Sequence, residues 1–165
     1  MPERATMQRA NQKLRRGRSA STAAGEFVRE EMDHIREGKH GARSAKQAIA
    51  IGLSKARRAG VPLRPPRRGK ATTKRAAARA TAVGQGKRTP RAPSKARSRA
   101  TTRALRREPH SAASHRALAS QARKAAGQRT RTARKAAARK AVRTKGPALR
   151  KAAARKAAAT RKRTG

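Results

Sequence analysis

The stretch that decides the fold is residues 25–61, GEFVREEMDHIREGKHGARSAKQAIAIGLSKARRAGV. It contains Phe27, the single aromatic residue of the chain, and every isoleucine. Five of the seven acids also lie here, at Glu26, Glu30, Glu31, Asp33 and Glu37. The rest of the chain is mostly alanine, arginine and lysine. We therefore expect residues 25–61 to be the part of the chain able to fold.

The first half of this stretch has the periodicity of an amphipathic helix. At 100° per residue, the apolar residues gather on one side and four acids gather on the other. Gly38 is expected to end the helix. The apolar face consists of Phe27, Val28, Met32 and Ile35. The acidic face consists of Glu26, Glu30, Asp33 and Glu37, and we expect it to be solvated. The alternative is that it holds the chain's own basic tail.

A second helix is predicted to begin after Ser44, whose hydroxyl would cap free backbone amides while Gln47 reaches back in a capping box. Gly60, which precedes Val61 and Pro62, is expected to end it. Its apolar face is Ala45, Ala48, Ile49, Gly52, Leu53 and Ala56. The two helices should close as an antiparallel hairpin over residues 23–61.

The hairpin offers a small core for an independent domain, because it lacks cysteine and has few large apolar side chains. Ile51 lies outside the main apolar face of its helix. Two interpretations stay open: Val61 or Leu63 covers Ile51, or Ile51 belongs to a self-association surface. In the second case the hairpin would bind a second copy of the chain or a protein partner.

The composition of the remaining chain opposes a packed domain. Lys and Arg number 48 against 7 acids, a net charge of +41. Residues 64–165 have a single acid, Glu108, and five large apolar residues, Val83, Leu105, Leu118, Val142 and Leu149. We therefore predict a mostly disordered chain that is all-α where ordered. The predicted parts are a basic disordered arm at 1–22, the hairpin at 23–61, a proline-rich linker at 62–70 and a basic tail at 71–165.

The chain has no cysteine and no apolar run long enough for a membrane span or a secretory signal. The expected location is cytoplasmic. Residues 1–24 also fit the composition of an organellar transit peptide, and GC-rich coding is a second source of the Ala/Arg/Gly/Pro bias.

The basic tail repeats one pattern. KAAARKA occurs at 135–141 and again at 151–157. Cations at four-residue spacing would share one helix face, where their repulsion opposes the helix until phosphates neutralise them. We therefore predict transient helices that form on binding nucleic acid. The candidate binding residues are Arg131, Arg134, Lys135, Arg139, Lys140, Arg143, Arg150, Lys151, Arg155 and Lys156.

Two shorter basic sites are candidates as well. Lys39, His40, Arg43 and Lys46 surround the amino end of the second predicted helix, where free amides favour an anion. The alternative is a solvated polar turn. In residues 66–70, PRRGK, the cations Arg67, Arg68 and Lys70 flank a glycine, which resembles a minor-groove hook without its second proline.

Catalytic and metal sites are not expected. Glu31 and His34 form one E-x-x-H pair near His40, but no second pair exists for a di-metal centre. We expect His34 to be a solvated helix residue, and we expect no metal, no cofactor and no enzymatic activity. A membrane-binding helix needs large apolar residues opposite its cations, and KAAARKA offers alanine alone, so no membrane partner is expected.

Two resemblances point to the same class of protein. The tail is similar to the Ala/Lys-rich tails of linker histones and of bacterial histone-H1-like nucleoid proteins. Residues 26–60, and SAKQAIAIGLSKARRAG at 44–60 above all, resemble a short domain of uncharacterised function found in small basic bacterial proteins. The resemblance implies a bacterial, nucleoid-associated protein.

The predicted function follows from the charge and from these resemblances. We expect nonspecific binding and condensation of double-stranded DNA by phosphate neutralisation. The alternative is an RNA- or ribosome-associated basic protein.

Overall fold

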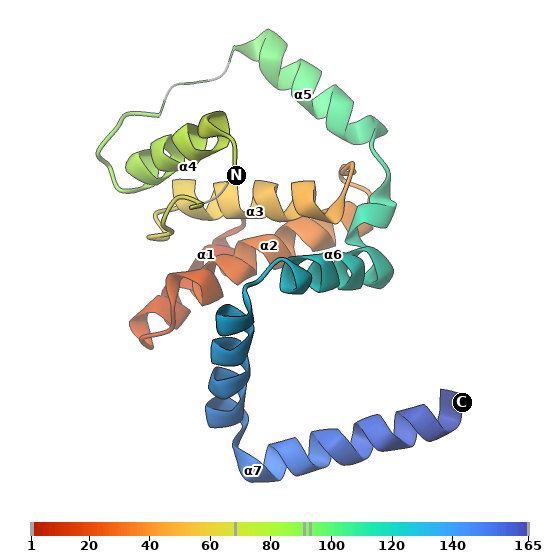
Figure 1. Ribbon diagram of the computed structural model, residues 1–165. Helices are drawn as coiled ribbons and strands as arrows, with labels where there is room; N and C mark the ends of the chain where they lie inside the picture. Colours follow the sequence, from red (N-terminus) through yellow and green to blue (C-terminus); the bar gives the residue numbers. More distant parts are fainter. Residues whose placement is uncertain (1, 68, 91, 93, 165) are drawn as a thin grey trace. The chain divides into compact units, whose positions relative to one another are not determined.

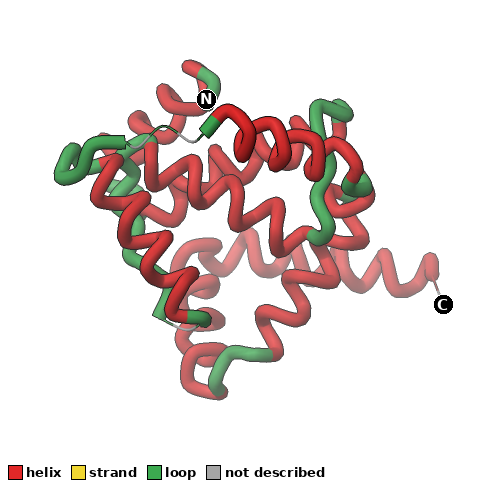
Figure 2. Tube along the Cα trace, turned by 90° about the horizontal axis from the view of Figure 1, so that it is seen from above, coloured by secondary structure: helices red, strands yellow, loops and turns green. Residues whose placement is uncertain are grey.

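The computed structural model describes residues 2–67, 69–90, 92 and 94–164, and over these ranges the protein consists of helices and loops without a strand (Figures 1 and 2). The chain divides into two compact units, residues 1–121 and 122–165. The elements are α1 (Arg4–Arg15), α2 (Ala20–Arg36), α3 (Ala45–Arg58), α4 (Ala71–Gly84), α5 (Lys95–Arg107), the 3-10 helix η1 (His110–Ala113), α6 (His115–Gly127) and α7 (Arg131–Thr164).

The prediction of a mostly disordered chain with one short helical hairpin is wrong. Helix α1 lies in the arm that was predicted to be disordered, and helices α4 to α7 make up most of the predicted tail. The physical reason is that alanine, arginine and lysine are strong helix formers. Large apolar side chains are also not required for packing where alanine and glycine let helix backbones approach closely.

The two predicted helices of the hairpin are present as α2 and α3. Ser19 caps α2 by accepting a hydrogen bond from the Thr22 amide, and Ser44 caps α3 by accepting one from the Gln47 amide. The Gln47 side chain accepts from the Arg43 amide at 2.9 Å, one residue earlier than a capping box places it. Gly38 and Gly60 follow the helices with positive φ angles of 76° and 89°, which glycine adopts without strain.

A glycine sets the distance between α2 and α3, which lie side by side in Figure 1. A Cβ added at Gly52 would lie 2.7 Å from Val28 Cα and 3.0 Å from the Phe27 carbonyl oxygen. The hairpin therefore closes backbone against backbone at this point. Its apolar side chains divide between two clusters of buried residues. One contains Ala10, Ala23, Ala24, Phe27, Ala56 and Val61, and the other contains Met32, Ile35, Ala42, Ala48, Ala112 and Ala113.

Helix α1 packs against α2 and covers part of the face predicted to be a solvated acidic stripe. Thr6 and Ala10 are buried in this contact. Glu26 and Glu30 are also buried, 6% and 4% exposed, so the prediction of a solvent-facing acidic side is wrong for both. Periodicity alone located the acids on one face, but the basic α1 supplies the charges that allow this face to be covered.

The segments after α3 return to the same core. Thr81 of α4 donates a hydrogen bond to the Leu63 carbonyl at 3.2 Å. The loop between α2 and α3 is held from the other side, since the Gly41 amide donates to the Leu105 carbonyl at 2.8 Å and the Ala42 amide donates to the Pro109 carbonyl at 3.1 Å. Residues 105–109 therefore clamp the loop of the hairpin.

The second unit consists of the end of α6 and all of α7. Gly127 ends α6, and Gly146, with φ 65° and ψ 171°, breaks α7 into two helical segments before Pro147. Apart from Gly146, every residue of α7 whose side chain the structure describes is exposed.

Candidate nucleic-acid interface

The seven acids of the chain all pair with basic side chains, and all lie in residues 1–121. Most of the basic partners come from α1, α2, α3 and the loop between α2 and α3. The pairs are Glu3 with His34 and Lys39, Glu26 with Arg9 and Lys13, Glu30 with Lys55, Glu31 with Lys55 and His40, Asp33 with Arg29 and Arg36, Glu37 with Lys39, and Glu108 with Arg43.

Close cations favour the ionised form of the Glu26 carboxyl. The hydrogen bond from Lys13, assisted by Arg9 at 2.8 Å, holds the pKa of Glu26 below its ordinary value, although burial acts in the opposite direction. On the basic side, the hydrogen bond to Glu37 raises the pKa of Lys39. The acids are thus paired with cations of the helical core.

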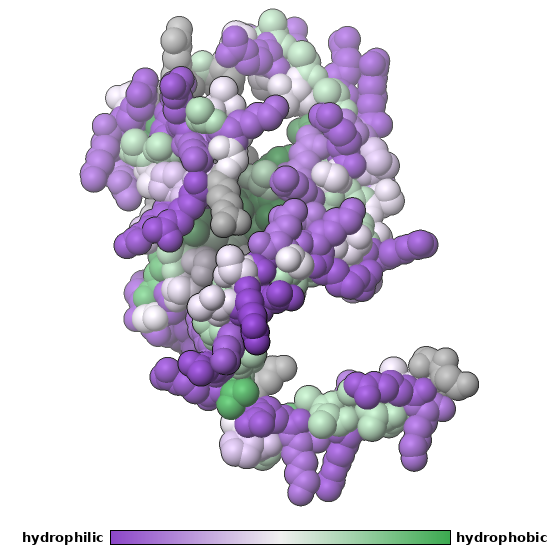
Figure 3. All heavy atoms as spheres, in the orientation of Figure 1, coloured by the Kyte–Doolittle hydropathy of each residue, from purple (hydrophilic) through white to green (hydrophobic). Residues whose placement is uncertain are grey.

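Helices α4 to α7 contain no acid, so their cations have no carboxylate on their own helix. In α7, the predicted residues Arg131, Lys135, Arg139 and Arg143 follow one another at four-residue spacing and are exposed. A shallow groove between side chains of this helix is lined by Thr132, Lys135, Ala136, Arg139, Lys140, Arg143 and Thr144. In Figure 3 hydrophilic side chains, in purple, project from the C-terminal segment, with pale green side chains between them.

The other predicted residues of the tail also lie on α7. Arg134 is in the first helical segment, and four residues are in the second segment, after Pro147. All of them are exposed. The four are Arg150, Lys151, Arg155 and Lys156.

A basic surface that the sequence analysis missed lies on α5. Arg99, Arg103, Arg106 and Arg107 line a second shallow groove together with Ser98 and Thr102. The arginines recur at spacings of three and four residues, which is the signal that predicts a shared helix face. The arginines of α5 were not among the predicted residues, because α5 lacks the KAAARKA repeat from which the binding residues were predicted.

The predicted phosphate site at the start of α3 does not assemble as expected. His40 points into the protein and its side chain is 18% exposed. Lys39 lies 2.9 Å from Glu37, and Arg43 lies 3.8 Å from Glu108, so both already face a carboxylate. Lys46 is exposed. The prediction did not consider that Glu37 and Glu108 lie beside the cations of this turn.

The remaining predicted residues are the cations of residues 66–70 and Ile51. Arg67 and Lys70 are exposed, and Arg68 lies outside the described residues. Ile51 is half-buried within the protomer, so self-association through this residue stays a prediction.

Comparisons with protein families, with curated proteins and with solved structures give no match for this chain. In the part of the chain that the structure describes, no helix is both long enough and apolar enough to cross a membrane.

Proposed function

We propose that the protein is a nonenzymatic binder of duplex nucleic acid, with DNA as its target, that acts by neutralising phosphates. One observation carries the proposal: every cation of α7 whose side chain the structure describes is exposed, in a unit that contains neither Asp nor Glu. The acids are confined to the other unit and are paired there. The surface available to a polyanion is thus almost purely basic.

The charge density of α7 suits a duplex. Residues 131–145 form a segment of roughly 22 Å at 1.5 Å per residue. They include six exposed cations, Arg131, Arg134, Lys135, Arg139, Lys140 and Arg143. A duplex of that length has about 13 phosphate charges, at one per 1.7 Å. One such segment therefore neutralises roughly half of the charge beside it, and counterion release supplies the affinity.

The aromatic residue of the chain is unavailable for stacking on unpaired bases. Phe27 is the only aromatic in the sequence and is 1% exposed inside the core. Single-strand binders use exposed aromatic side chains as stacking platforms. This favours duplex over single strands, and the 33 arginines, which pair phosphates with a planar fork, favour backbone contacts over base readout.

A nonspecific, highly cationic binder of this kind would coat and condense DNA. We therefore place it, as part of the same proposal, among histone-H1-like proteins of a bacterial nucleoid. Structured or ribosomal RNA is the alternative target, because counterion release acts on both polyanions.

The test compares full-length variants in duplex binding at several salt concentrations. Replacing Arg131, Lys135, Arg139 and Arg143 together by Gln should weaken binding to AT-rich and GC-rich duplexes alike. It should also reduce the slope of log K against log salt by about 3 to 4, since each phosphate contact contributes about 0.9. Circular dichroism checks that the variant stays helical, as Gln is a good helix former.

The matched control replaces Arg131, Arg139 and Arg143 by Lys, which retains every charge. This control should keep the wild-type slope and lose only a small part of the affinity. Unchanged affinity and slope in the Gln variant would contradict the proposal. Tighter binding to an RNA duplex than to a DNA duplex at equal salt would favour the RNA alternative.

A further inference from the structure

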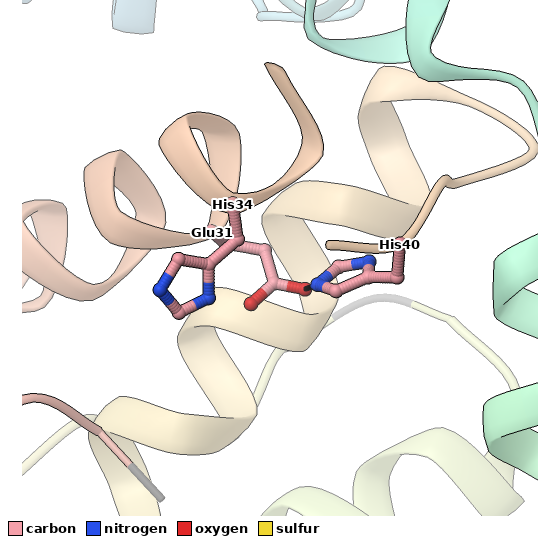
Figure 4. A group of neighbouring side chains, drawn as sticks. All are labelled: Glu31, His34 and His40. Atoms are coloured by element: carbon pink, nitrogen blue, oxygen red, sulfur yellow. Dashed lines mark ion pairs between the residues drawn. The ribbon is translucent and has the colours of Figure 1, made fainter. Parts of the chain in front are cut away.

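A buried polar cluster lies where α2 meets the loop that follows it. It consists of Glu31 and His34 of α2 and His40 of the loop, and one ligand atom from each lies within 4.8 Å of the others (Figure 4). The Glu31 side chain is 0% exposed, and those of His34 and His40 are 15% and 18% exposed. The expectation of a solvated His34 is therefore wrong.

The contacts around each imidazole determine which nitrogens are free to accept. Nδ1 of His40 lies 3.1 Å from the Gly41 carbonyl oxygen, which only accepts, so Nδ1 carries the hydrogen. In the neutral ring this leaves the lone pair of Nε2 facing Glu31 Oε1 at 3.3 Å. His34 repeats the pattern, since its Nε2 lies 3.1 Å from Glu3 Oε1. Figure 4 shows a nitrogen of His34 turned toward the Glu31 carboxylate.

Neither oxygen of Glu31 receives a hydrogen bond, although both are buried. Lys55 Nζ lies 2.6 Å from Oε2 as an ion pair, outside the angular range of a hydrogen bond, and 3.8 Å from Glu30 Oε1. One ammonium thus serves two buried carboxylates, Glu30 and Glu31. The lone pairs of the Glu31 carboxylate and of the two imidazoles point toward one place. Two carboxylates and one ammonium leave one negative charge in excess there, which favours the binding of a second cation.

We propose that Glu31, His34 and His40 bind a divalent transition-metal ion of the zinc class. Two imidazoles and one carboxylate form a three-ligand set that zinc uses in proteins, with a further position left for water. His34 donates a hydrogen bond to Glu3 and His40 donates one to the Gly41 carbonyl, and such hydrogen bonds orient histidines that bind a metal. Lys55 stays paired with Glu30 when the metal takes Glu31.

The geometry requires only a small closure. Ligands at about 2.0–2.2 Å from a tetrahedral zinc are about 3.3 Å apart, against the present separations of up to 4.8 Å. His40 belongs to a loop and His34 is partly exposed, so side-chain rotation gives both the closure and the entry path. Bound metal would tie α2 to the loop that residues 105–109 clamp.

The experiment is a calorimetric titration of the full-length chain with ZnCl2 at neutral pH. Wild type should bind one zinc ion per chain. The single variants His34→Gln and His40→Gln should each bind at least 100-fold more weakly, and Glu3→Gln should bind about 10-fold more weakly. His115→Gln, which removes a histidine far along the sequence at the start of α6, is the matched control and should bind as wild type does.

A second measurement serves in case a variant fails to fold. Histidines of the wild-type chain are modified with diethylpyrocarbonate, with and without zinc, and the products are read by mass spectrometry. Zinc should protect His34 and His40 and leave His115 reactive. Absence of zinc uptake by the folded wild type, equal affinity in a folded His40→Gln variant, or equal protection of His115 would each overturn the proposal.

Discussion

At the residue scale, Glu26 shows how a charge predicted to face solvent becomes part of the interior. Its carboxylate accepts hydrogen bonds from Lys13 and Arg9 across the contact between α1 and α2. The side chain is 8% exposed, whereas those of its two partners are 37% and 46% exposed. The pair is therefore partly screened by water, and its contribution to stability is modest.

This pairing predicts an acid-dependent loss of stability. The folded-state pKa of Glu26 is lowered from 4.5, first by the hydrogen bond from Lys13. A lowered folded pKa contributes stability above the unfolded pKa, and that stability is lost as pH falls through the folded pKa. Glu26→Gln should cost about 1–2 kcal/mol at neutral pH. The difference from wild type should shrink well below pH 4.5.

Urea unfolding followed by circular dichroism over a pH series measures this difference. A gap between wild type and Glu26→Gln that stays constant from neutral pH to strongly acidic pH would contradict the role given to Glu26. Asp33→Asn is a suitable comparison, because its two arginine contacts are exposed and should contribute little at any pH.

Several residue-scale features were predictable because they depend on local chemistry. The cap at Ser44 and the glycine ends at Gly38 and Gly60 follow from hydroxyl capping and from positive φ, and all three are confirmed. The burial of Glu26 and Glu30 on the acidic side of α2 was not predictable in this way. Periodicity locates a face, but the residues that cover it come from α1. The basic composition of residues 1–22 had led to a prediction of disorder for this helix.

At the scale of elements, close helix packing at small residues replaces a core of large side chains. Gly52 allows α3 to meet the α2 backbone, and a Cβ at Gly84 would lie 1.9 Å from the Arg57 carbonyl oxygen, where the end of α4 meets α3. Alanines of α1, α2 and α3 fill the first buried cluster around Phe27. The small number of large apolar residues after residue 63 led to a prediction of disorder with only transient helices, whereas α4 to α7 are present.

A pair of glycine variants tests this packing. Gly52→Ala should destabilise the protein by about 1–3 kcal/mol, because the added methyl group meets the backbone at Val28 and Phe27 and the helices must separate. Gly25→Ala is the matched control in α2. A Cβ there meets nothing within 4 Å, so the variant should be more stable by about 0.5–1 kcal/mol through helix propensity alone.

Thermal and urea unfolding of the two variants measure the difference. Opposite signs of the change in unfolding free energy are the expected result. A Gly52→Ala variant as stable as Gly25→Ala would show that α2 and α3 do not meet at this glycine.

The candidate interface was partly predictable at this scale. Recurrence of cations every four residues identified the basic face of α7, and α5 has the same signal without the repeat. The E-x-x-H pair of Glu31 and His34 near His40 was evident in the sequence, but no metal site was expected there. The close approach of the three side chains was not predictable, because His40 reaches Glu31 only through the loop held by Gly41 and Ala42. That juxtaposition depends on residues 105–109, which are distant in the sequence.

At the scale of the whole chain, the distribution of acids is the organising feature. The acids stabilise one helical unit by pairing with its own cations, and residues 122–165 have no Asp or Glu at all. These residues hold 17 of the 48 cations, and no carboxylate among them competes with phosphate. The central claim is that phosphates contact these acid-free helices and not the cations already paired with acids.

Lysine acetylation footprinting of the full-length protein, with and without duplex DNA, tests this claim most directly. Lys135, Lys140, Lys151 and Lys156 of α7 are exposed and should be protected by DNA, with protection decreasing as salt is raised. Lys39 is the internal control, because its side chain is 52% exposed yet lies 2.9 Å from Glu37. The account predicts strong protection of the α7 lysines and little change at Lys39; equal protection of Lys39, or unprotected α7 lysines at saturating DNA, would contradict it.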